Sequence, residues 1–200
     1  TSTTAVAKPS VIRILNADDN SVLGYLSRDF GSAGRRVSTT DLANALLVSI
    51  EGSDSSASTS TAVSAVSFIS SNSAAPADLI YLSGVLGGSG SFRQDFGPGS
   101  GNFAYIAASN PTPQGSSPIA VDNSFTRSTS IARNAETAIW TYDPQTGALS
   151  AFWVNTDGSL VPTIPFLFTD QGLLFITGDI SAFRGDFGTN DTPVKLEFVE

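Results

Sequence analysis

The sequence predicts an all-β fold, an antiparallel β-sandwich or distorted barrel with long loops and at most one short helix. Its apolar residues occur in bursts of about four to eight, rich in Val, Ile, Phe and Tyr. Gly, Pro, Asn, Asp and Ser bound these bursts, and no long stretch shows helical periodicity. A length of 200 residues suits one β domain over 1–200, with 1–9 as an extended N-terminal tail.

The bursts give the expected strands in chain order. They lie at Ser10–Leu15, Ser21–Leu26, Ala45–Ile50, Ala62–Ile69, Leu79–Ser83, Phe103–Ala108, Ala138–Tyr142, Leu149–Asn155, Thr163–Thr169, Leu173–Thr177 and Val194–Val199. Asp41–Ser49 is the helix candidate, capped by Thr40 or Asp41, although its β-branched end favours a strand. The compositions of Ser53–Thr61 and Asn110–Pro118 predict mobile surface loops, because neither segment can bury enough to order itself.

The composition excludes most catalytic machinery. The chain has no His and no Cys, so a Ser-His-Asp triad, a zinc or copper site and thiol redox chemistry cannot be built. The segment 16–20 alternates oxygen ligands as a calcium loop does, but Ser21 and Ser27 stand where the loop needs Gly and a bidentate acid. We therefore expect no cofactor and no metal.

The excess of acidic over basic residues limits the classes of partner that the chain can bind. A net charge of −8 with no run of basic residues argues against nucleic acid and against an anionic membrane surface. No apolar stretch approaches the roughly 18 residues of a spanning helix.

The start of the chain predicts its location. It begins at Thr1 with neither Met nor a leader, which predicts a secreted, extracellular protein after signal removal. Asn190-Asp191-Thr192 is a sequon, so Asn190 is a candidate glycosylation site.

The tripeptide Asp-Phe-Gly occurs three times, each time shortly after an Arg. The copies are 29–31, 95–97 and 186–188, and the arginines are Arg28, Arg93 and Arg184. In such a segment Asp can bond backbone N–H groups, Phe can plug the edge of a core, and Gly can take a positive φ. We interpret the copies as structural corners, with Phe96 and Phe187 buried.

A Trp-bearing hairpin is the strongest candidate for a binding surface. Trp140 and Tyr142 lie on its first strand, Phe152 and Trp153 lie on its second, and Asp143-Pro-Gln-Thr-Gly147 forms the turn between them. These rings could form a sugar-stacking platform, or Trp140, Phe152 and Trp153 could belong to the core.

The second candidate surface is the Asn110–Pro118 segment, through Pro111 and Pro113. Proline restrains the backbone, which lowers the entropy lost when a partner binds.

A glycosidase would need only two carboxylates, so the missing histidine does not forbid one. Glu is scarce, however, and most Asp residues lie in turn-like contexts. Asp95 and Asp186 are the nominal candidates because their flanking segments match. We expect no enzymatic activity and assign no catalytic residue.

Three runs carry a family resemblance. They are Glu136-Thr-Ala-Ile-Trp-Thr-Tyr-Asp-Pro-Gln-Thr-Gly-Ala-Leu-Ser-Ala-Phe-Trp-Val-Asn-Thr-Asp-Gly-Ser159, Leu174-Phe-Ile-Thr-Gly-Asp-Ile-Ser-Ala-Phe183 and Val194-Lys-Leu-Glu-Phe198. With Val22-Leu-Gly-Tyr-Leu26 and Asn102-Phe-Ala-Tyr-Ile106, they resemble a group of secreted proteins of mushroom-forming (basidiomycete) fungi. The resemblance implies that this chain is the small, non-catalytic subunit of a heterodimeric laccase. In such an enzyme the copper would lie in the large subunit.

Two function classes therefore remain open. The first is a secreted accessory subunit that binds and stabilises a larger secreted enzyme, such as a multicopper oxidase of the laccase type. The second is a carbohydrate-binding module or lectin-like protein that uses the aromatic hairpin.

Overall fold

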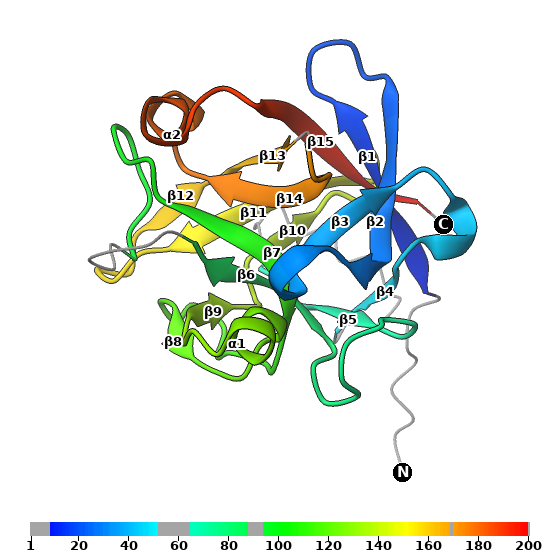
Figure 1. Ribbon diagram of the computed structural model, residues 1–200, viewed down its shortest axis with the longest axis horizontal. Helices are drawn as coiled ribbons and strands as arrows, with labels where there is room; N and C mark the ends of the chain where they lie inside the picture. Colours follow the sequence, from blue (N-terminus) through cyan, green and yellow to red (C-terminus); the bar gives the residue numbers. More distant parts are fainter. Residues whose placement is uncertain (1–8, 52–64, 88–93, 169, 200) are drawn as a thin grey trace.

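The computed structural model describes residues 9–51, 65–87, 94–168 and 170–199. Antiparallel β-strands are the main secondary structure of the described residues (Figure 1). The strands are β1 (Ser10–Asn16), β2 (Val22–Phe30), β3 (Arg36–Thr39), β4 (Leu47–Ile50), β5 (Phe68–Ser70), β6 (Tyr81–Leu86), β7 (Phe103–Ser109), β8 (Ile119–Ala120), β9 (Asn134–Glu136), β10 (Trp140–Tyr142), β11 (Ala148–Val154), β12 (Leu160–Pro162), β13 (Ile164–Phe168), β14 (Leu173–Thr177) and β15 (Asp191–Val199).

The strand pairings close on themselves. β1 pairs in turn through β4, β5, β6, β7, β14 and β13 to β15, and β15 pairs back with β1, each pair antiparallel. The β2–β3 hairpin gives a second connection between β1 and β14. The antiparallel pairs confirm the all-β prediction, and their closure into a ring corresponds to a distorted barrel. A closed ring also leaves few free strand edges.

Further strands extend the ring. β11 pairs with β15, β10 pairs with β11, and a bridge between Trp140 and Val66 ties β10 to the segment before β5. β12 pairs with β11. β9 and β8 extend outward from β6. The Trp-bearing hairpin predicted from the sequence is therefore the β10–β11 pair, and it continues the sheet beyond β15.

The main core combines side chains from most strands of the ring. Ile12, Leu26, Phe68 and Trp153 are among its fully buried members. A second, aromatic cluster lies under α2 (Ile180–Phe187) and a third lies under α1 (Ser124–Thr129). Asp179 caps α2 and Asn123 caps α1, each through its side-chain oxygen.

Every predicted strand overlaps a strand of the structure, and all but Leu173–Thr177 have one or both ends shifted. The predicted helix Asp41–Ser49 is instead a single 3-10 turn, η2 (Leu42–Asn44), followed by β4, as the β-branched residues favoured. A second 3-10 turn, η1 (Ser32–Gly34), precedes β3. The expected tail residues 1–8 and the expected loop Ser53–Thr61 lie outside the described residues. None of the helices in the described part of the chain is long and apolar enough to cross a membrane.

Candidate binding groove

The two tryptophans belong to the core. Trp140 and Trp153 are both 0% exposed. Trp140 Nε1 donates to the carbonyl of Leu82 at 3.1 Å, and Trp153 Nε1 donates to that of Gln94 at 2.7 Å. Each indole is thus buried with its N–H satisfied. The prediction of a sugar-stacking platform on these two rings is wrong. The alternative, that Trp140, Phe152 and Trp153 are core residues, holds for the two tryptophans but not for Phe152, which is half-buried.

The other two aromatic residues of the hairpin are half-buried. Side chains alternate between the two faces along β11, so Phe152 points away from the core that Trp153 fills. Tyr142 packs edge-on against Phe198 at 5.3 Å between ring centroids. Phe152 therefore remains the hairpin's aromatic residue beside a surface hollow.

The 110–118 segment is anchored more firmly than its composition predicts. Thr112 and Thr137 are buried and exchange hydrogen bonds, each backbone N–H donating to the other's hydroxyl at 3.0 Å. Thr112 thus fixes the segment to the residue after β9. Pro111 and Pro113, on either side, are exposed, as their predicted binding role requires. The expectation that this segment cannot order itself is wrong, because a buried polar pair holds it.

The hairpin and this segment meet at a groove of about 510 Å³. Gln114 and Gly115 come from the segment, and Phe152 comes from β11. Leu160 of β12, 64% exposed, lies opposite Val154 in the strand register. We call this hollow the Phe152–Leu160 groove. Its lining residues are Ala65, Gln114, Gly115, Ala138, Ile139, Thr141, Phe152, Val154 and Leu160.

The groove adjoins a smaller, more polar hollow of about 210 Å³. Gln114 lines both hollows, and its Nε2 donates to the carbonyl of Ala65 at 3.0 Å. Glu51 lines the smaller one and accepts a 2.6 Å hydrogen bond from the Tyr81 hydroxyl, which raises the pKa of Tyr81 to about 12. The site thus has an apolar part and a polar part, as binding sites with a fixed ligand orientation do.

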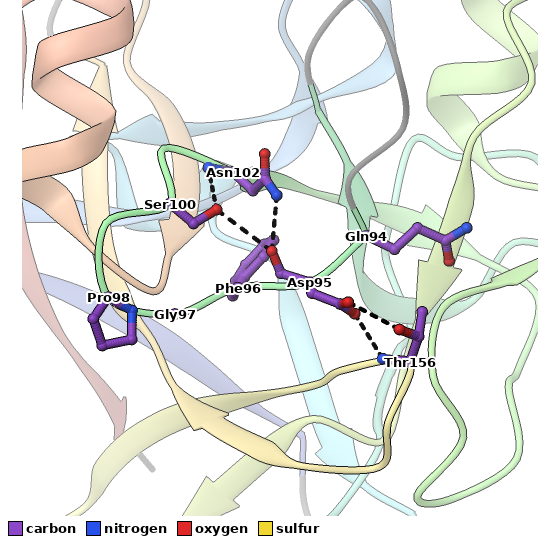
Figure 2. A pocket seen from close by; sticks show the side chains of 8 residues that line it. All are labelled: Gln94, Asp95, Phe96, Gly97, Pro98, Ser100, Asn102 and Thr156. Atoms are coloured by element: carbon purple, nitrogen blue, oxygen red, sulfur yellow. Dashed lines mark hydrogen bonds between the residues drawn. The ribbon is translucent and has the colours of Figure 1, made fainter.

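A separate pocket of about 650 Å³, with polar and apolar lining in nearly equal parts, lies at the second Asp-Phe-Gly copy (Figure 2). The Asp95 carboxylate turns to Thr156 and accepts from its backbone N–H at 2.7 Å and its hydroxyl at 2.9 Å. Asn102 Nδ2 donates to the Asp95 carbonyl at 2.8 Å. These bonds occupy both oxygens of the carboxylate, so Asp95 joins two loops.

The second copy is the structural corner that the sequence predicts. Phe96 is 4% exposed and stacks on Trp153 at 4.4 Å between ring centroids. Asn155 holds its backbone from both sides, accepting from the Phe96 N–H at 2.8 Å and donating to its carbonyl at 2.9 Å. Gly97 has a φ of 152°, which disfavours a side chain.

The other two copies differ from this corner. Phe187 ends α2 and is 50% exposed, so its predicted burial is wrong. Phe30 is half-buried beneath the guanidinium of Arg36, and Gly31 has a negative φ of −81°. The same tripeptide thus lies in a loop, at the end of a helix and at the end of a strand. Its conformation depends on the tertiary contacts around each copy rather than on the three residues alone.

The nominal catalytic pair does not share the pocket around the second Asp-Phe-Gly copy. Asp95 lines this pocket, whereas Asp186 is not among its lining residues and packs against the backbone of Gly101. Within the described ranges, no three His, Cys, Asp or Glu side chains gather as metal ligands would. The structure therefore assigns no acid–base pair to these two residues.

Glu136 is a buried acid to which the sequence assigned no role. It is 1% exposed, one oxygen accepts from the Val154 N–H at 3.1 Å, and the other has no hydrogen-bond partner. Burial raises its pKa to about 8, against the smaller opposing effect of the Val154 bond. Sequence could place Glu136 beside a strand, but its burial follows from the way β6 and β11 pack around it.

No protein-family model, curated protein or solved structure matches this chain.

Proposed function

We propose that this chain is a secreted, non-catalytic accessory subunit that binds a larger secreted enzyme through the Phe152–Leu160 groove. The observation that carries the proposal is the meeting of the β10–β11 hairpin and the 110–118 segment at one apolar hollow with Leu160 at its edge. A partner side chain inserted there would cover Leu160 and Phe152 and gain the free energy of removing apolar area from water.

The anchoring of the groove favours a protein partner. The buried Thr112–Thr137 pair and the Gln114–Ala65 bond hold the 110–118 segment in place before binding. Little conformational entropy is then lost on association. Exposed Pro111 and Pro113 restrain the same backbone further. Such a preformed hollow suits an anchoring side chain presented by a folded surface.

The chemistry of the chain supports a non-catalytic role. Without imidazole or thiolate it has no ligand set for copper, so an oxidase partner would hold its own metal. The resemblance to secreted fungal proteins points to a laccase-type oxidase as this partner. In the carbohydrate-binding alternative, neither tryptophan can contact a sugar, because both indoles are buried in the core. Sugar stacking would then have to depend on Phe152.

The proposal is tested by measuring binding of the chain to the large subunit of a heterodimeric laccase, by co-elution and by calorimetry. Leu160→Glu places a charge in the groove and is expected to weaken binding at least about tenfold, equivalent to 1.4 kcal/mol. Val22→Glu is the matched control, because Val22 is 56% exposed on β2 and does not line the groove.

Equal affinity of the two variants would remove the groove from the interface. Absence of any complex with the large subunit, combined with retention of the wild-type chain on a polysaccharide column, would replace the proposal by the carbohydrate-binding alternative.

A further inference from the structure

The turn from α2 to β15 carries the sequon in a fixed conformation. Gly188 ends α2 with a φ of 90° and redirects the chain. The side chain of Asp191, the middle residue of the sequon, is 0% exposed and accepts from Arg184 Nη2 at 2.8 Å. This ion pair, with a buried Asp191 carboxylate and a partly exposed Arg184, anchors the start of β15. Asn190, one residue earlier, is exposed.

An exposed aromatic ring lies three residues before Asn190. Phe187 contacts the rings of Phe103 at 5.2 Å and Phe183 at 5.0 Å between centroids, yet half of its surface meets solvent. Three residues of chain separate two Cα atoms by at most about 11 Å, within reach of one sugar attached to the Asn side chain. The C–H face of a pyranose packs favourably on such a ring.

We propose that Asn190 carries an N-linked glycan whose first N-acetylglucosamine covers the exposed face of Phe187. The inference shares only secretion with the proposed function. A lipid diphosphate-linked oligosaccharide is the donor. A bond forms between Asn190 Nδ2 and the anomeric carbon, the bond from that carbon to the diphosphate oxygen breaks, and the lipid diphosphate leaves as the amide loses one proton.

The local hydrogen bonding is compatible with this attachment. Asn190 Nδ2 donates to the Asp170 carboxylate. A primary amide has two N–H groups, and glycosylation consumes only one. The remaining N–H can keep the bond to Asp170 and orient the first sugar relative to the turn. Covering Phe187 would also bury an apolar surface that the fold leaves in water.

Occupancy is tested on the chain secreted from yeast, by intact mass before and after treatment with an amide-cleaving glycosidase. The wild type is expected to lose a glycan mass on treatment, and Thr192→Ser is expected to do the same because it keeps the sequon. Asn190→Gln and Thr192→Ala should show no such mass. An unmodified Asn190 in the secreted wild type would overturn the proposal.

The contact with Phe187 is tested by a double comparison. Wild type and Phe187→Ala are each made in yeast and in bacteria, so that the glycan is the difference within each pair. The glycan is expected to raise the Tm of the wild type by about 2–4 °C. It should leave the Tm of Phe187→Ala within error. Phe187→Leu, which keeps an apolar side chain without a flat face, serves if the Ala variant does not fold.

A readout independent of stability is the proton NMR spectrum of the attached sugar. Packing on the ring should shift the N-acetylglucosamine protons upfield in the wild type and not in Phe187→Ala. A glycan that raises the Tm equally in both backgrounds, with unshifted sugar protons, would overturn the contact.

Discussion

Glu136 Oε2 accepts a hydrogen bond from the backbone N–H of Val154 at 3.1 Å, at the point where β11 has passed the end of β10. The carboxyl group replaces a strand as the partner of this N–H. Its other oxygen is buried without a hydrogen-bond partner. The arrangement favours the neutral acid, because a charge there would be desolvated and only partly compensated.

Glu136→Gln should therefore remove a pH dependence of folding. The pKa of Glu136 rises from 4.5 to about 8 on folding, so the folded chain binds more protons than the unfolded chain between these values. Stability from this group is fully present below pH 4.5 and is lost as the pH rises toward 8. The total loss is on the order of 3–5 kcal/mol.

The measurement is urea unfolding of wild type and Glu136→Gln from pH 4 to pH 9. The variant should gain stability relative to the wild type steadily across this range and level off near pH 8. Parallel curves for the two proteins would show that Glu136 does not titrate in this way.

The two matching Phe residues should respond very differently to truncation. Phe96→Ala is expected to cost about 3–5 kcal/mol, because it removes a buried ring that stacks on Trp153. Phe187→Ala should cost less than about 2 kcal/mol, because half of that side chain is already in water. The free energies of unfolding from urea titration give both values, and similar costs would contradict the assigned burial.

The strands were predictable where burial and β-branching coincide, as in Leu173–Thr177, which is identical to β14. The missed strands are short and interrupted. β9 and β12 span three residues each, and β9 includes Asn134 and Glu136 while β12 ends at Pro162, so neither is long enough to show the alternation of a strand. α2 was missed because Gly185 and its aromatic residues resemble a loop closure, whereas Asp179 caps it and Phe183 is buried beneath it.

The candidate groove was predictable only in its parts. Composition drew attention to Phe152, Pro111 and Pro113, but strand order decides that the two segments meet. The same alternation that exposes one side of Phe152 buries Trp153, and a sequence does not show which side of a strand faces the core. Nothing in the sequence distinguished Leu160 as a groove residue, because a single exposed Leu is common on protein surfaces.

Arg36 should be far less replaceable than its neighbour Arg35. It is 1% exposed and stays charged at neutral pH, although burial lowers its pKa to about 9. Its guanidinium donates to the carbonyl of Arg28 at 2.8 Å and to the Ser73 hydroxyl at 2.6 Å. Arg36→Lys is expected to cost on the order of 2–4 kcal/mol, because an ammonium cannot serve these divergent acceptors.

The control for this prediction is Arg35→Lys, which alters a half-exposed side chain that bonds to Ser32 within its own turn. Its cost should stay below about 1 kcal/mol. Thermal unfolding of both variants, followed by circular dichroism, makes the comparison. Equal losses would mean that the buried contacts of Arg36 contribute little to stability.

The buried Thr112–Thr137 pair should control the order of the 110–118 segment. Thr137→Val keeps the shape of the side chain but removes the hydroxyl that accepts from the Thr112 N–H. A buried donor left without a partner costs about 1–3 kcal/mol. Because Thr112 is the buried anchor of the segment, we expect that cost to appear as local opening of 110–118.

Hydrogen exchange across 110–118 should accelerate about tenfold or more in Thr137→Val, and partner binding at the Phe152–Leu160 groove should weaken with it. Thr146→Val, in the exposed β10–β11 turn, should leave exchange in 110–118 unchanged. Wild-type exchange in Thr137→Val would show that contacts other than this pair hold the segment.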